Sequence, residues 1–532
     1  MEPGLTPAIS LHTLQNRTVD VAIIGGGING AGLAREAALR GLSVALFEKG
    51  DFASGTSGRT SGLIHGGIRY LEQGAFALVR AAIRERNLLT RLAPHLVRPI
   101  PFLFPIYRQD HRSRGRLRIG MLLYDLLAGR ENIGSHKMLN LSETLALEPA
   151  LCREGLRGAA RFYDCQMDDA RLCLAVLFSA RALGVAIFNY TPVIGLLQRD
   201  GQTYGVSVLD TCSGQRHDIP AQVVVNAAGP WADAVCGMEG TPSRRIRPTK
   251  GIHLVLPSIT RHAVVVPSRT SRRIYFVIPW GGLSLVGTTD CDDVDDLDHV
   301  RANREEMVAL LAEIRPVIPH AYTPDTVLSH YAGVRPLAYA EGNTASDLSR
   351  EGALAWTRSG MLTLIGGKYT LFRRTGEQGV SAILKEKRHL RARPRQEKPL
   401  LGGEMASLEA YLQAEEAVAP RRYGISVALL CRLVGRYGTR YQEVLGLADE
   451  TPRLREALTP EGDTILAEVV YAVRAEMAVT LTDFMRRRTR LAFGPFKRDM
   501  TLMDRVSREM GALLGWDDAR RREEVTCYLG AL

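Results

Sequence analysis

The chain has 532 residues, of which 45% are hydrophobic and 23% charged, and its formal net charge is +11. This length predicts about three domains, and the composition is that of a globular protein and excludes disordered, collagen-like and coiled-coil chains. The positive charge favours an anionic partner, which leaves nucleic acid, a phosphorylated substrate and an anionic membrane surface open.

The sequence indicates neither a membrane-spanning helix nor a metal site. Its longest uncharged stretches, residues 182–198 and 274–289, stay below the roughly 20 residues that a spanning helix needs. The first 17 residues lack a basic start followed by an apolar run, so no secretory signal is expected. The eight cysteines are scattered without a C-x-x-C pair, which favours a reduced cytosolic compartment and predicts no zinc or iron–sulfur site.

The first fifty residues predict a dinucleotide-binding unit. A β-branched strand at 19–24 leads into the glycine turn 25–30, a helical pattern runs to Arg40, and a second strand at 43–47 ends before Glu48. Between a strand and a helix, G-x-G-x-x-G predicts a tight turn, close approach of a pyrophosphate to the backbone and close packing of the helix on the strand. The Glu48 carboxylate is then expected to accept hydrogen bonds from a ribose. The acid argues against a 2′-phosphate and so favours FAD or NAD over NADP. A glycine-rich turn that binds nothing is the alternative.

Two later turns favour FAD over NAD. Residues 223–232 form a strand that ends in a small-residue turn, and residues 362–370 form another strand followed by paired glycines. Three well-separated backbone turns suit a large cofactor whose isoalloxazine ring must also be enclosed.

Six motifs in order make the chain similar to a known family. They are GGGING at the first turn, SGLIHGGIRY at 61–70, NAAGPW at 226–231, FVIPW with GTTD between 276 and 290, GVRPL at 333–337 and GGKYT at 366–370. Together they resemble the FAD-dependent, respiratory glycerol-3-phosphate dehydrogenases of the glycine-oxidase/D-amino-acid-oxidase superfamily. The resemblance implies oxidation of sn-glycerol 3-phosphate to dihydroxyacetone phosphate by hydride transfer to FAD, with electrons passed to a membrane quinone.

The expected fold class is α/β: a Rossmann-type FAD-binding domain with an inserted antiparallel β substrate-capping domain and a C-terminal helical domain. The expected ranges are 19–90, 156–240 and 335–385 for the FAD-binding domain, 91–155 and 241–334 for the capping domain, 386–404 for a solvated basic linker, and 405–532 for the helical domain.

Flavin-dependent oxidation of an alcohol needs a proton acceptor, and a phosphate-bearing substrate needs cationic groups. His65 is the candidate base, since imidazole titrates near neutral pH; a structural histidine is the alternative. Arg335 lies between apolar residues, where an arginine is otherwise a buried salt-bridge partner. Arg59 occupies a position where a small residue is expected.

The expected catalytic residues are His65, Arg69, Arg335 and Lys368. The expected substrate-binding residues are Tyr70, Arg335, Arg350 and Lys368. The expected cofactor-binding residues are Gly25, Gly27, Asn29, Gly30, Glu48, Thr56, Ser57, Ser61, His65, Gly229, Gly366, Gly367, Lys368 and Thr370.

FAD is expected to be non-covalent, because no cysteine lies in the segments that the resemblance places near the flavin. The apolar stretch 119–127, with basic residues on its N-terminal side, is either a core helix or a membrane-docking element at the inner face of the cell membrane. The basic run 486–490 is expected to be a solvated helix face. A homodimer is left open, and no nucleic-acid partner is expected.

The alternative functions either use the same fold for a different oxidation or do not involve such an oxidation. A glycerol-3-phosphate oxidase would give its electrons to oxygen, and an amine or amino-acid oxidase would need a carboxylate clamp. A flavin-bearing RNA-modifying or non-enzymatic protein is the remaining alternative.

Overall fold

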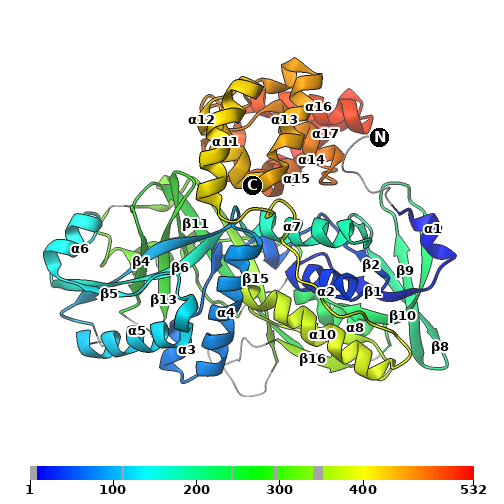
Figure 1. The fold of residues 1–532 in the computed structure, drawn as a ribbon, viewed down its shortest axis with the longest axis horizontal. Coiled ribbons are helices and arrows are strands. Elements are labelled where there is room, and N and C mark those ends of the chain that lie inside the picture. Colours follow the sequence, from blue (N-terminus) through cyan, green and yellow to red (C-terminus); the bar gives the residue numbers. More distant parts are fainter. Residues whose placement is uncertain are drawn as a thin grey trace.

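The computed structural model describes residues 9–339 and 352–532, apart from 111–112, 241–243, 270, 272, 293, 295 and 321, and without the side chains of Arg69, Glu72 and Arg130. Two sheets lie next to each other, and a helical domain lies across one side of them (Figure 1). Within the described residues, no helix combines the length and the apolar character that crossing a membrane requires.

The first sheet has eight strands, and its centre is parallel. Its strand β1 (Val19–Ile24) is buried almost throughout, as expected for a parallel strand with both faces covered. The order is β16 (Ala353–Trp356), β17 (Leu362–Ile365), β10 (Arg216–Asn226), β1, β2 (Val44–Phe47) and β7 (Ala186–Phe188), with β8 (Val193–Arg199) and β9 (Gln202–Leu209) extending β10. The helices of this part are α1 (Leu11–Gln15), α2 (Ile28–Leu39), α7 (Asp169–Ala182), α8 (Ala232–Gly237) and α10 (Phe372–Glu386).

The second sheet has nine strands and is antiparallel except where β12 runs parallel to β4. Its order is β15 (Ser329–Ala338), β11 (Ile246–Pro257), β14 (Leu283–Gly287), β13 (Ile274–Trp280), β12 (Ala263–Pro267), β4 (Val97–Tyr107), β6 (Leu156–Met167) and β3 (Leu63–Ile64), with β5 (Lys137–Leu139) beside β6. The helices of this part are α3 (Arg69–Glu72), α4 (Phe76–Leu92), α5 (Arg114–Ala128), α6 (Leu141–Leu147) and α9 (Arg304–Ile314).

The C-terminal part is helical and has a hydrophobic core of its own. Its helices are α11 (Leu408–Tyr423), α12 (Val427–Tyr437), α13 (Tyr441–Glu450), α14 (Leu466–Arg474), α15 (Leu481–Asp483), α16 (Met500–Leu514) and α17 (Asp518–Gly530). A single π-helical turn, η8 (Phe484–Arg488), follows α15. The predicted fold class is therefore confirmed.

The expected domain ranges do not coincide with sheet membership at three strands. β3 and β6 fall within ranges expected for the FAD-binding domain, and β15 overlaps such a range, yet all three pair in the nine-stranded sheet. The reason is that a strand is assigned by its pairing partner, which can lie more than a hundred residues away and leaves no local trace in the sequence.

Candidate active site

A cavity of about 480 Å³ lies where the two sheets meet. Its walls come from the β1–α2 turn, the segment after β2, the β10 turn, the facing strands β11 and β15, and the turn after β17. Every expected cofactor-binding residue except Gly30 lines it, and so do Tyr70 and Arg335. Segments that lie hundreds of residues apart in the sequence thus meet around one space.

The glycine turn brings the start of α2 up to this cavity. Gly25 has a φ of +113°, and a Cβ on it would lie 2.6 Å from the carbonyl oxygen of Ala227. A Cβ on Gly30 would lie 2.0 Å from the carbonyl oxygen of Gly25, so Gly30 lets helix and strand pack closely from behind the cavity wall. The N-terminal amides of α2 therefore face a space in which they can bind phosphate.

Glu48 and Trp231 mark the end of the cavity near this turn. The Glu48 carboxylate accepts hydrogen bonds from the backbone N–H groups of Gly26 (2.7 Å) and Gly50 (3.0 Å), and burial raises its pKa. The ammonium of Lys49 lies 4.1 Å from the centre of the Trp231 ring. An acid and an aromatic ring at this end suit the ribose and the base of a dinucleotide.

Another part of the lining brings together four of the expected site residues. The Lys368 Nζ donates to the carbonyl oxygen of His65 over 2.5 Å and lies 5.4 Å from the centre of the Tyr70 ring. The Thr370 hydroxyl accepts from the N–H of His65 over 3.3 Å. The turn after β17 therefore positions the segment that carries His65, although about 300 residues separate the two.

Arg335, on β15, also lines the cavity. Its Nη1 forms an ion pair with Asp290 and donates to the carbonyl oxygen of Thr289 (3.1 Å), while its Nη2 donates to the Thr288 hydroxyl (2.9 Å). Arg59 also lines the cavity, and burial lowers its pKa. The backbone of Arg69 begins α3, its side chain is not described, and Arg350 lies outside the described residues.

Sequence reasoning missed His253, a buried histidine in the wall. Its Nε2 lies 2.8 Å from the Ser61 hydroxyl, and its ring stacks on that of Tyr331 with centroids 4.9 Å apart. Burial, and next to it the charge of Arg335, lower the pKa of His253 to about 3, so the ring is neutral at physiological pH. A histidine inside a strand gives no local signal of this role. Only the alternation of side chains along a strand places His253 on the same face as Gly251, which lies two residues earlier and faces Arg335.

The donor set fits FAD and offers no metal site. No cluster of His, Cys, Asp and Glu among the described residues could hold a metal ion. The cavity joins a glycine turn at a helix start, a buried acid, and lining cations and imidazoles, which suits a flavin dinucleotide. A Cβ on Gly27 would lie only 3.0 Å from the Ser57 hydroxyl, so a side chain there would crowd the cradle that the cofactor needs.

Comparisons with known proteins agree with this site. Residues 20–371 match the family described as FAD dependent oxidoreductase, and residues 395–521 match the C-terminal domain of alpha-glycerophosphate oxidase. Glycerol-3-phosphate dehydrogenase from Synechocystis is 37% identical, with 97% of this chain and 96% of that protein covered. The human mitochondrial glycerol-3-phosphate dehydrogenase is 34% identical, with coverages of 97% and 73%.

A solved structure extends the likeness to three dimensions. The glycerol-3-phosphate dehydrogenase from Bacillus halodurans, complexed with FAD, superposes with a TM-score of 0.81 at 28% identity, covering 98% of this chain and 95% of that one. FAD is therefore the cofactor of this cavity, and the chain belongs to the family of FAD-dependent glycerol-3-phosphate dehydrogenases.

Proposed function

We propose that the protein oxidises sn-glycerol 3-phosphate to dihydroxyacetone phosphate and passes the electrons to a membrane quinone. The observation that carries this proposal is that Lys368, His65 and Arg335 line the same FAD cavity, with Lys368 hydrogen-bonded to the backbone of His65. Two cations and an imidazole in one cavity suit an anionic substrate whose hydroxyl must lose a proton.

Each of these side chains has a distinct task in the proposal. FAD, when bound, accepts the hydride that leaves the substrate's secondary carbon. Arg335 holds an oxyanion with a guanidinium whose orientation Asp290 and Thr288 determine. Lys368 stabilises the negative charge that develops on the substrate oxygen, and His65 accepts the hydroxyl proton.

Two further residues of the expected set complete the phosphate site in this proposal. Arg69 and Arg350 are assigned to the substrate end by the family motifs alone. Their contribution is a prediction on sequence, separate from the contacts of Arg335 and Lys368.

Anaerobic titration of the purified yellow protein tests the substrate. Glycerol 3-phosphate should bleach the flavin absorbance, whereas glycerol and D-amino acids should leave it unchanged. Bleaching by an amino acid and not by glycerol 3-phosphate would overturn the proposal in favour of an amino-acid oxidase. Comparison of reoxidation by a quinone analogue and by oxygen then tests the acceptor: fast reaction with oxygen and none with quinone would make the protein an oxidase.

The same proposal includes non-covalent FAD. The cavity lining contains His65 and His253 but, among the described residues, no cysteine. Acid precipitation should therefore release the yellow colour into the supernatant, and colour that stays with the pellet would show a covalent bond.

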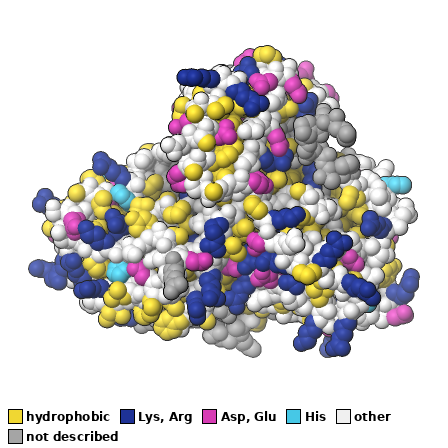
Figure 2. Space-filling model, in the orientation of Figure 1, with side chains coloured by type: hydrophobic (Ala, Val, Ile, Leu, Met, Phe, Trp, Pro, Cys, Tyr) yellow, Lys and Arg dark blue, Asp and Glu magenta, His cyan; other side chains and the backbone are white. Residues whose placement is uncertain are grey.

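A quinone is dissolved in the bilayer, so the proposal places the protein on the cytoplasmic face of the membrane through α5. The inner face of this helix is buried through Met121 and Tyr124, while its outer face is apolar and exposed, with Ile119 61% and Leu126 75% exposed. Figure 2 shows hydrophobic side chains gathered at the lower left, near α3 and α5 of Figure 1, with basic side chains beside them. An exposed apolar face next to basic residues suits an anionic lipid surface.

A further inference from the structure

The basic run at 486–490 lies against the FAD-binding part of the molecule. The expectation of a solvated helix face is wrong here, because Arg488 is fully buried and Arg487 nearly so. These residues end the π-helical turn η8. Buried arginines need acidic partners. Asp483, four residues before Arg487, pairs with Arg487, and a second acid comes from a distant part of the chain.

Asp51, which follows β2, is the partner of both. Arg488 donates from Nη1 to Oδ2 (2.7 Å) and from Nη2 to Oδ1 (2.9 Å), and Arg487 donates from Nε to Oδ2 (2.5 Å). Although burial alone would raise it, the charges of Arg488 and Arg487 lower the pKa of Asp51 to about 2. The carboxylate is thus charged, fully buried and bound by a bidentate fork, which defines its orientation.

Asp51 begins the segment that forms one wall of the FAD cavity. Residues 53–57 line that cavity. The N–H of Ala53 donates to the carbonyl oxygen of Gly26 (3.2 Å), and the Ser57 hydroxyl accepts from the N–H of Ile28 (2.9 Å). Fixing Asp51 therefore fixes a segment that is hydrogen-bonded to the glycine turn and to the start of α2.

A third arginine of the same run contacts another segment near the cavity. Arg490 forms an ion pair with Asp168 (2.8 Å), and the neighbouring Asp169 accepts from the N–H (2.7 Å) and the hydroxyl (2.8 Å) of Thr60. Thr60 lines the cavity. The acidic partners of the run thus connect to the cavity lining: Asp51 lies two residues before Ala53, and Asp168 adjoins Asp169, which is hydrogen-bonded to Thr60.

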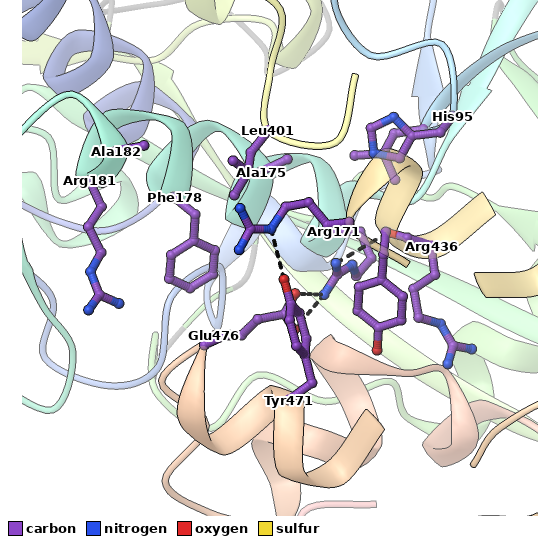
Figure 3. A pocket seen from close by; sticks show the side chains of 14 residues that line it. His95, Arg171, Ala175, Phe178, Arg181, Ala182, Leu401, Arg436, Tyr471 and Glu476 are labelled. Atoms are coloured by element: carbon purple, nitrogen blue, oxygen red, sulfur yellow. Dashed lines mark hydrogen bonds and ion pairs between the residues drawn. The ribbon is translucent and has the colours of Figure 1, made fainter. Parts of the chain in front are cut away.

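Another ion pair crosses the same interface without reaching the FAD cavity. Arg171 of α7 binds both carboxylate oxygens of Glu476 at 2.7 Å beside a small cavity of about 70 Å³ (Figure 3). This small cavity shares no lining residue with the FAD cavity. In Figure 3, Arg181 and Arg436 point away from the pair, so these cations do not converge with Arg171 on a ligand. Glu476 also contacts Arg488: its carbonyl oxygen accepts from Nη2 of Arg488 (2.7 Å), and its carboxylate lies 3.9 Å from Nε, so this pair is continuous with the contacts of Arg488.

We propose that Arg488 and Arg487 are positioning residues for FAD: through Asp51, the C-terminal helices hold segment 51–57 in the conformation that binds the cofactor. The proposal concerns the FAD site alone and does not depend on the identity of the substrate or of the electron acceptor.

FAD binding to the apoprotein, measured by quenching of flavin fluorescence well below the melting temperature, tests this proposal. Arg488→Met should raise the FAD Kd at least tenfold, and Arg488→Lys should give an intermediate value because lysine keeps the charge but loses the fork. Arg436→Met is the control: it breaks the buried Arg436–Glu468 pair within the C-terminal part, so it should lower the melting temperature of the apoprotein but leave the FAD Kd within twofold.

A milder variant covers the case in which Arg488→Met does not fold. Arg490→Gln breaks a half-exposed pair and should raise the FAD Kd several-fold. Hydrogen exchange of residues 51–60 in the folded apoprotein should increase in both variants and stay unchanged in Arg436→Met. The proposal is overturned if the Arg488 and Arg490 variants bind FAD as tightly as the parent, or if Arg436→Met weakens FAD binding as much as they do.

Discussion

Arg335 and Asp290 form an ion pair in the wall of the FAD cavity, with both side chains largely buried. Asp290 lies in the segment after β14, whereas Arg335 lies on β15, so the pair joins two neighbouring parts of the capping sheet. Because Nη2 is also bound by the Thr288 hydroxyl, the plane of the guanidinium is defined before any substrate enters. Such preorganisation lowers the entropic cost of binding an oxyanion.

The first prediction follows from this geometry. Arg335→Lys should keep FAD bound but lower kcat/KM for glycerol 3-phosphate by about 30- to 1,000-fold, which corresponds to ~2–4 kcal/mol of lost transition-state binding. Lysine offers one compact charge and cannot satisfy Asp290, Thr288 and an oxyanion together. Steady-state kinetics with a soluble dye measures the loss, and Arg304→Lys, in an exposed pair, is the control. Near-normal efficiency would make Arg335 a structural residue only.

The pH dependence of flavin reduction should distinguish the roles of His65 and His253. His253 is neutral down to a pKa of about 3, so its own titration lies outside the range from pH 5 to 9. His253→Asn should therefore lower the rate of flavin reduction without changing the shape of its pH profile. His65→Asn should lower the rate by about 100-fold or more and change the shape, since a general base is removed. Anaerobic stopped-flow measurements across this pH range decide the question, and the opposite pattern would assign the base to His253.

Local signals in the sequence predict the cofactor and much of the site, and tertiary pairing accounts for what they miss. The glycine turn and Glu48 are recognisable because their chemistry depends on a few consecutive residues. The contacts of Asp290 and His253 are not, because each side chain acts through a partner from a distant segment of the chain. The prediction of a solvated face for 486–490 is wrong for the same reason: a basic run is ordinarily solvated, and nothing near it in the sequence indicates that Asp51 is its partner.

Asp169 should make stability depend on pH near neutrality. Burial, and next to it the charge of Asp168, raise the pKa of Asp169 to about 6, above its ordinary value of 3.8. A raised pKa means that the folded state favours the protonated form, so its stabilising effect is complete below about pH 4 and is lost as the pH rises through 6. The loss is at most about 3 kcal/mol. Asparagine cannot ionise but can still accept from the N–H of Thr60.

The melting temperature of Asp169→Asn relative to the parent should therefore rise between pH 5 and pH 8. Circular dichroism melts of both apoproteins at the two pH values measure the difference. Asp325→Asn, in an exposed ion pair, is the control and should show no such trend. An equal difference at both pH values would show that Asp169 does not titrate in this range.

The last prediction concerns the surface of α5. Its exposed apolar residues include Leu122 and Leu123, and Arg114, Arg116 and Arg118 are exposed near its N-terminal end. Each basic residue near an anionic leaflet contributes about 1 kcal/mol, and this attraction falls off within a Debye length. Binding to vesicles should therefore strengthen with anionic lipid and weaken with salt, and the apolar contact should leave a part that salt does not remove.

Replacing Leu122 and Leu123 by serine should lower vesicle binding and quinone reduction together and spare reduction of a soluble dye, because the inner face of α5 still packs through Met121 and Tyr124. Val418→Ser is the matched control, since Val418 is equally exposed but lies on α11 of the C-terminal part. Cosedimentation with vesicles that contain anionic lipid measures the effect. If the double variant sediments as fully as the parent, α5 is not the docking element; if the parent itself never sediments and reacts fast with oxygen, the electrons go to oxygen and not to a membrane quinone.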